Sequence, residues 1–258
     1  MCGRFAVTID PARLAAELHA VDETGPGHPG PNYNVAPTTD IVAVVARHDR
    51  LGDPEGEPTR RIRLMRWGLL PNWVKPDADG RPLTPPKNNG RPLINARAET
   101  LTRSPAFRAA AEHKRCLVPM DGYYEWMPNP EVAGRKTPKT PFYLHRTDGR
   151  PLLVAGLWSA WGAGRMLTCA VVTTAAVGQC ARVHDRMPLL LEEADWDRWL
   201  DPDRPAPTEL LAAPPEVGGL ALRPVSTLVN KVANNGPELI EPVDVGQPVD
   251  LFQPPGPR

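Results

Sequence analysis

Residues 116–126 read CLVPMDGYYEW, two short apolar runs on either side of Asp121. The first run predicts a strand over Cys116–Val118, and the second predicts a strand over Gly122–Trp126. Further short apolar runs predict more strands, at Ile41–Ala46, Ile62–Trp67, Phe142–His145, Leu152–Trp158, Leu167–Thr174 and Pro188–Leu191. The chain is therefore expected to be rich in strands.

Helices are expected to be fewer. An aspartate or serine followed by proline, or an acidic first turn, marks the start of a helix. These signals predict three helices, from Asp10-Pro11 to about Ala20, from Ser104-Pro105 to about His113, and over Glu192–Leu200. Because strands and helices do not alternate regularly and no linker divides two cores, we expect one domain of the α+β class.

Proline and glycine interrupt these elements. The 33 prolines concentrate at 22–32, 76–92, 127–141, 201–215 and in the tail from 242. Since both residues break helices and strands, these segments are predicted to be loops or mobile chain.

Composition limits the classes of function. The 258 residues include 30 basic and 30 acidic side chains, so the net charge is zero and nucleic-acid binding would need a local patch. The four cysteines lack C-x-x-C spacing, which argues against a zinc site and fits a reduced compartment. The start does not resemble a signal peptide, and no stretch approaches the ~18 apolar residues of a membrane span. We expect a soluble, cytoplasmic protein.

Cysteine stands at position 2. Methionine is normally trimmed before a small residue, so the mature chain is expected to begin with Cys2, with a free amine and a thiol on adjacent carbons. Such a group captures an aldehyde as a Schiff base and then closes a thiazolidine ring through sulfur, and it can also attack an acyl group. The alternative is an inert, buried residue, since free cysteine behaves as a small hydrophobe.

Two titratable residues are candidates for proton transfer. Glu125 lies among aromatic residues, where burial would raise its pKa toward the range useful in acid–base catalysis. The alternative is an outward-facing strand residue. His184 precedes an apolar run and is suited to proton transfer at neutral pH, or else it is an ordinary loop histidine.

Polar and aromatic residues suggest a nucleic-acid surface. Asn95 can orient a substrate without titrating, and Arg97, two residues later, can bind a phosphate through its guanidinium group. The alternatives are that Asn95 only stabilises a loop and that Arg97 is a solvated surface residue. Trp67 and Trp73 bracket a turn-rich loop, and loop aromatics stack on bases in single-strand binders, although they also anchor loops onto cores.

Several segments together resemble one family. They occur in order as MCGRF at 1–5, YNVAP at 33–37, RWGL at 66–69, INARAET at 94–100, CLVP at 116–119, GYYEW at 122–126, HDRMP at 184–188, PVS at 224–226 and NNG at 234–236. This set is similar to the SOS response-associated peptidase (SRAP) family of abasic-site processing proteins. The resemblance spans about residues 1–243, which leaves 244–258 as a flexible, proline-rich tail.

The resemblance implies a function and a fold. The mature Cys2 would form a covalent thiazolidine crosslink with the aldehyde of an abasic site in single-stranded DNA and shield the lesion during the SOS response. The other residues that match family positions are Asn95, Glu125 and His184 for catalysis, and Arg4, Asn34, Trp67, Arg97 and Trp126 for DNA binding. The implied fold is a single α+β domain on curved, barrel-like sheets with peripheral helices. No metal or other cofactor is implied, and the expected form is a monomer that joins the nucleoid when it acts on DNA.

Two other functions use the same residues. The family name suggests a cysteine peptidase, with Cys2 as nucleophile and His184 as base. A single-strand DNA binder without catalysis would need only the arginines and tryptophans.

Overall fold

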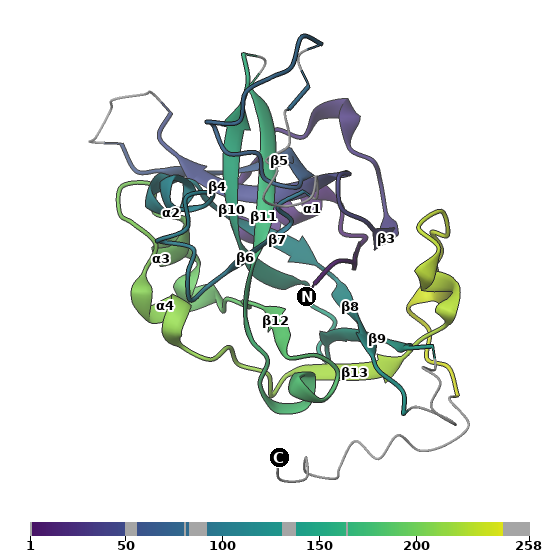
Figure 1. Ribbon diagram of the computed structural model, residues 1–258. Helices are drawn as coiled ribbons and strands as arrows, with labels where there is room; N and C mark the ends of the chain where they lie inside the picture. The colour runs from purple at the N-terminus through teal and green to yellow at the C-terminus, as the bar shows by residue number, and fades with distance from the viewer. Residues whose placement is uncertain are drawn as a thin grey trace.

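A computed structural model describes residues 2–49, 56–79, 81–82, 92–130, 138–163 and 165–244. Parts of the proline-rich loops at 76–92 and 127–141, and the tail from 245, lie outside these residues. Two sheets with few helices form one α+β domain (Figure 1). Among the described residues, no helix has both the length and the apolar character to cross a membrane.

The larger sheet curls around its own core. Its strand order is β12 (Arg186–Pro188), β11 (Met166–Ala175), β10 (Leu152–Trp161), β7 (Arg115–Met120), β4 (Asp40–Arg47), β5 (Thr59–Trp67) and β2 (Val21–Asp22). β11 also pairs in parallel with β5 and with the short β6 (Asn95–Arg97). The β11–β5 pairing brings distant members of the strand order together, so the sheet is curved, as the family resemblance implies.

The smaller sheet packs against it. Its order is β13 (Leu220–Pro224), β9 (Thr140–Arg146), β8 (Gly122–Met127), β1 (Phe5–Val7) and β3 (Asn32–Val35). β1 lies between β8 and β3 and is antiparallel to both. The purple start of the chain therefore lies in the middle of the molecule, next to β8 (Figure 1).

Both faces of the larger sheet are buried. Along β4, Val42 and Val44 belong to the core under the helices, whereas Ala43 and Val45 belong to the core between the sheets. A strand covered on both faces is apolar at successive positions, and Ile41–Ala46 has that pattern. Cys2 lies in the core between the sheets.

The helices are short and lie on the periphery: α1 (Pro11–Leu18), α2 (Arg108–His113), α3 (Trp196–Leu200) and α4 (Thr208–Ala212). As predicted, Asp10 caps α1, since its Oδ1 accepts hydrogen bonds from the amides of Ala12 and Arg13. α2 begins later than expected because the residues after Ser104 form turns first.

One predicted strand is displaced. Pro188–Leu191 was expected to be a strand, but β12 covers Arg186–Pro188 instead. β12 pairs with β11, and beyond Pro188 the chain turns toward β10, where Leu190 forms an isolated bridge with Val154. The apolar run is buried by this change of partner rather than by one continuous strand. Sequence patterns also missed the short strands β1, β2, β3, β6 and β13.

Gly122 allows β8 to approach β9 closely. A Cβ atom at Gly122 would lie 2.5 Å from both the Leu144 carbonyl oxygen and the Tyr143 ring, whereas one at Gly219 would meet nothing within 4 Å. Overpacking of a tight site costs about 1–3 kcal/mol. We therefore expect Gly122→Ala to lower the free energy of unfolding by about 2 kcal/mol or more, measured by urea denaturation.

Gly219→Ala is the matched control and should change the free energy of unfolding by less than about 0.5 kcal/mol. Equal effects of the two substitutions would contradict the packing described for β8.

Candidate active site

Strand pairing carries the start of the chain between the sheets. β1 and β8 are antiparallel, with Phe5 opposite Tyr123. The amide of Tyr124 donates to the Arg4 carbonyl at 2.9 Å, which extends this pairing toward the N-terminus. The residues before β1 therefore run along the second half of β8, and Cys2 is completely buried.

Asn95 holds the backbone of Cys2. It lies on β6, opposite Val171 of β11, and its Nδ2 donates to the Cys2 carbonyl at 2.8 Å. Its Oδ1 is buried and accepts no hydrogen bond within the described part of the chain. A buried acceptor without a partner is unfavourable, so this oxygen is available to a donor on a bound substrate.

Glu125 faces the interior. It lies on β8 with only 4% of its surface exposed, so the alternative of an outward-facing strand residue is wrong. Burial raises the pKa of its carboxyl group above the ordinary value, and the nearby His184 partly opposes this effect. A carboxylate with a raised pKa is a stronger base than an exposed one, which suits it for proton transfer.

His184 lies between a 3₁₀ turn, Gly178–Arg182, and β12. Its Nδ1 is 2.7 Å from Asp185 Oδ1 and 3.0 Å from the amide nitrogen of Arg186. The Arg186 amide donates to an unprotonated Nδ1, whereas Asp185 accepts from a protonated Nδ1, so one contact or the other orients the ring, depending on where the proton lies. His184 is close enough to Glu125 to lower the pKa of that carboxyl group.

The thiol of Cys2 is neutral in this environment. Burial raises its pKa strongly, and the negative charge of Glu125 raises it further. Cysteine peptidases use the opposite arrangement, in which a nearby cation lowers the pKa of the thiol. A thiol in this environment would need a base in order to react, and the carboxyl group of Glu125 is close enough to affect its pKa.

Arg4 and Asn34 bind the protein's own backbone. Arg4 Nη1 donates to Asn34 Oδ1 at 2.7 Å and to the Val229 carbonyl at 2.8 Å. Asn34 is buried, and its Nδ2 lies 3.0–3.2 Å from the carbonyls of Val229, Lys231 and Asn234. Asn34 therefore positions a neighbouring segment and does not itself present a surface to DNA.

Arg97 is an exposed cation at the edge of the site. Its side chain makes no hydrogen bond or ion pair within the described residues, although Glu99 is near in sequence. Arg186 binds Glu99 through two hydrogen bonds of 2.5 and 3.0 Å, and this pairing lowers the pKa of Glu99. Because Arg186 compensates that carboxylate, Arg97 remains available to an anion.

The tryptophans divide into buried and exposed groups. Trp67, predicted to contact DNA, is 0% exposed, and its Nε1 donates to the Ile94 carbonyl at 2.9 Å. It cannot stack on a base in this conformation, because Phe5 covers it at 5.1 Å between ring centres. Trp73, at the other end of the same loop, is 53% exposed. Trp126 is partly exposed, and its Nε1 donates to Asn230 Oδ1 at 2.7 Å.

Sequence reasoning assigned no role to the segment 226–236. The structure joins it to Arg4, Asn34 and Trp126 through the hydrogen bonds above. Its asparagines were the available signal, because asparagine side chains commonly bind backbone groups of irregular segments.

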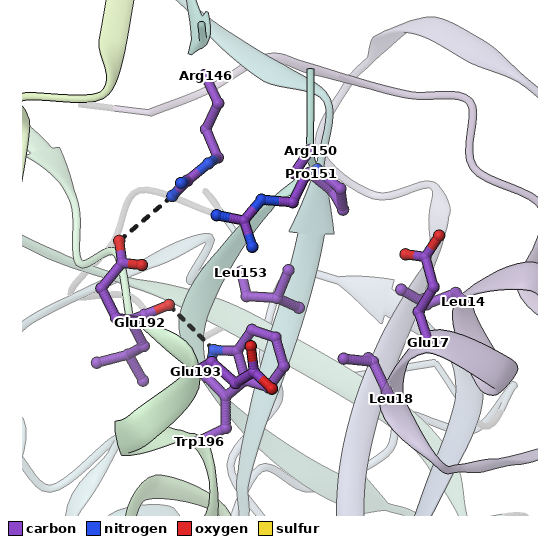
Figure 2. A pocket seen from close by; sticks show the side chains of 11 residues that line it. Leu14, Glu17, Leu18, Arg146, Arg150, Pro151, Leu153, Glu192, Glu193 and Trp196 are labelled. Carbon is purple, nitrogen blue, oxygen red and sulfur yellow. Dashed lines mark hydrogen bonds and ion pairs between the residues drawn. The ribbon is translucent and has the colours of Figure 1, made fainter. Parts of the chain in front are cut away.

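A separate pocket of about 220 Å³ lies between α1 and the start of β10 (Figure 2). Leu14, Leu18 and Leu153 form part of its lining, and Arg146 points toward Glu192, 3.3 Å away, on the side of the pocket opposite α1. None of the predicted site residues lines this pocket. No group of three or more His, Cys, Asp or Glu side chains suited to a metal ion occurs within the described ranges.

Comparisons with known proteins show which family this chain resembles. The model of the family "SOS response associated peptidase (SRAP)" matches residues 1–232. The chain is 32% identical to abasic site processing protein YoqW of Bacillus subtilis, covering 93% of this chain and 99% of that one. It is 31% identical to abasic site processing protein YedK of Escherichia coli, covering 94% and 100%. It is 27% identical to abasic site processing protein HMCES of Gallus gallus, covering 97% and 80%.

Solved structures share the fold. A protein from Bacteroides thetaiotaomicron superposes with a TM-score of 0.74 at 21% identity, covering 94% of this chain and all of that chain. A phage-related protein from Bordetella bronchiseptica has a TM-score of 0.58 at 30% identity, covering 87% and 94%.

The burial of Trp67 and exposure of Trp73 predict opposite mutational effects. Trp67→Ala should lower the free energy of unfolding by about 3–5 kcal/mol, because it leaves a large cavity. Trp73→Ala should change it by less than about 1 kcal/mol, because the ring is mostly in solvent. Thermal and urea denaturation of the two variants would measure this difference, and a stable Trp67→Ala protein would contradict the buried placement.

Proposed function

Because this chain belongs to the SRAP family, and its relatives are abasic site processing proteins, we propose that it processes abasic sites in DNA through a covalent bond to Cys2. The observation that carries the proposal is the placement of Cys2. Asn95 holds its backbone, Glu125 acts on its thiol, and Arg97 lies exposed at the edge of the site. A nucleophile, a base and an anion-binding group are thereby combined.

The reaction begins once Met1 is removed, since only then is the Cys2 nitrogen an amine. The amine adds to the aldehyde carbon of the ring-opened abasic sugar, and loss of one water gives the Schiff base. The sulfur then attacks the same carbon, the thiol proton passes to nitrogen, and a five-membered thiazolidine ring closes. The intramolecular second step is fast because sulfur and carbon are held together at high effective concentration.

Glu125 moves the protons in this sequence. Both nucleophiles are mostly protonated at neutral pH, and burial makes the thiol still harder to ionise. Glu125 accepts the proton of the attacking group and returns it to the leaving hydroxyl of the carbinolamine. In the reverse direction the same carboxyl group opens the ring, so one residue serves formation and reversal.

His184 and Asn95 bind the sugar in this mechanism. His184 stabilises or protonates the sugar oxygen as the furanose ring opens, and one contact or the other at Nδ1 holds the imidazole ring in orientation. Asn95 offers its buried Oδ1 to a sugar hydroxyl or to the amine of Cys2.

The DNA partner is single-stranded in this proposal. A buried nucleophile reaches a sugar more easily when the nucleotide is not paired in a duplex. Arg97 binds a phosphate, and the exposed faces of Trp73 and Trp126 stack on bases. The protein acts as a monomer in the cytoplasm, at the nucleoid, and the crosslink shields the lesion during the SOS response.

A general peptidase is a weaker alternative. It would need a Cys2 thiolate, whereas the pKa of this thiol is raised. Removal of Met1 is the one peptide cleavage that the proposed chemistry requires.

Mature protein mixed with single-stranded DNA that carries one abasic site should give a shifted band on a denaturing gel. The matched control, Cys2→Ala, retains an N-terminal amine and should give a band only after borohydride reduction, because an imine cannot close to a thiazolidine without sulfur. The absence of a band with the mature protein, or an equally stable band with Cys2→Ala, would contradict the proposal. Cleavage of unrelated peptides would favour the peptidase instead.

Glu125→Gln should slow both formation and reversal of the crosslink by about 100-fold, the lower range for loss of a general acid–base. The rates are measured by quenching samples over time and, for reversal, by adding a trapping aminothiol. If a folded Glu125→Gln protein formed and reversed the crosslink at wild-type rates, Glu125 would not be the general acid–base.

A further inference from the structure

The segment after β13 carries an apolar surface that the proposed chemistry does not use. Leu228 and Val232 are each 52% exposed, and Lys231 lies exposed between them in the sequence. Only Val21, Trp73 and Met166 are comparably exposed large hydrophobic residues within the described residues. We call Leu228–Val232 the 228–232 ridge.

Hydrogen bonds and one buried side chain fix the backbone of the ridge. Asn34 and Arg4 both donate to the carbonyl of Val229, whose side chain is completely buried. Asn234 Nδ2 donates to the Leu228 carbonyl at 2.9 Å, which ties the start of the ridge to the residues that follow it. A surface fixed in this way loses little conformational entropy when it binds a partner.

The ridge is hydrogen-bonded to residues that are close in sequence to the candidate site, although Val229 and Trp126 pack in a different apolar cluster from Cys2. Trp126 donates to the side chain of Asn230 at 2.7 Å, and Trp126 follows Glu125 directly on β8. Arg4 connects the ridge to the chain just after Cys2. In Figure 1 the yellow segment that contains the ridge lies beyond β9 and near β3, on the side of the smaller sheet.

The chemistry of the ridge suits nucleobases. Residues 226–236 contain one lysine, three asparagines and no acidic residue. Apolar side chains such as leucine insert beside or between bases, amides hydrogen-bond to base edges, and a lysine binds phosphate. The exposed carboxylates Glu238 and Glu241 follow this segment, and the Glu238 carboxylate lies beside Gly236, so an acidic group borders the end of the segment.

We propose that the 228–232 ridge binds the bases of single-stranded DNA that flanks the abasic nucleotide, with Lys231 on a neighbouring phosphate. This inference rests on the proposed function and specifies its substrate, which is a strand long enough to reach from Cys2 to the ridge.

The test separates binding from crosslinking. The probe is a single strand that contains a tetrahydrofuran abasic analogue, which has no aldehyde, in a short form with a few nucleotides and in a long form flanked on both sides. Affinity is measured by fluorescence anisotropy for wild type and for the double variant Leu228→Ser with Val232→Ser. Val21→Ser, on edge strand β2 of the other sheet, is the control for loss of an exposed apolar side chain.

The double variant should bind the long probe at least about fivefold more weakly, because serine removes the apolar contact of both side chains with the bases, and it should bind the short probe within about twofold of wild type. Lys231→Ala should reduce the slope of log Kd against log salt by about 0.7, the value for one phosphate of a single strand. Unchanged affinity for the long probe, or an equal loss on both probes, would overturn the ridge as a flanking-strand site. Because the probe cannot crosslink, failure of the covalent proposal would appear separately, as the absence of a Cys2-dependent band.

Discussion

The pairing of β1 with β8 is the constraint on which the site depends. It draws the start of the chain into the space between two sheets, where an N-terminus, normally mobile and solvated, becomes part of the core. The same strand, β8, contributes Glu125 to the interior and Trp126 to the edge of the site. Asn95 completes the arrangement by binding the Cys2 carbonyl from β6, a strand of the other sheet. Cys2 is therefore held by elements of both sheets.

Burial gives these residues their chemical character. It raises the pKa of the Cys2 thiol and of the Glu125 carboxyl group, and in the proposed mechanism Glu125 is the base that accepts the thiol proton. The charge needed for DNA is local, as expected for a chain with no net charge. Arg186 compensates Glu99, which leaves Arg97 as an exposed cation beside the buried centre. The absence of net charge fits the proposed function, in which the protein acts at abasic sites and has little general attraction to DNA.

The long apolar runs could be predicted from sequence because burial on both faces leaves an unmistakable pattern, as in Ile41–Ala46. The helix at Pro11 could be predicted because its cap is local. The strands β1 and β6 could not be predicted, because a segment of three residues is too short to show an alternating pattern. Such strands form only where neighbouring strands supply hydrogen bonds.

The same distinction between local and tertiary signals applies to the site. Chemistry and family resemblance predict Cys2, Asn95, Glu125 and His184 as site residues, but the sequence does not show which side chains are exposed. The buried Trp67 and the exposed Trp73 differ only in tertiary packing, and Arg4 and Asn34 turned out to bind a segment 200 residues away in the chain.

Intact mass spectrometry of the complex between the mature protein and abasic single-stranded DNA tests the central claim most directly. A thiazolidine at Cys2 predicts the mass of the chain without Met1 plus the DNA minus one water, no gain of mass on borohydride treatment, and a Cys2 sulfur that no longer reacts with iodoacetamide. An adduct that retains Met1, or that gains two hydrogens on reduction, or in which the Cys2 thiol still alkylates, would show that the bond is formed elsewhere or by the amine alone, and would contradict the account.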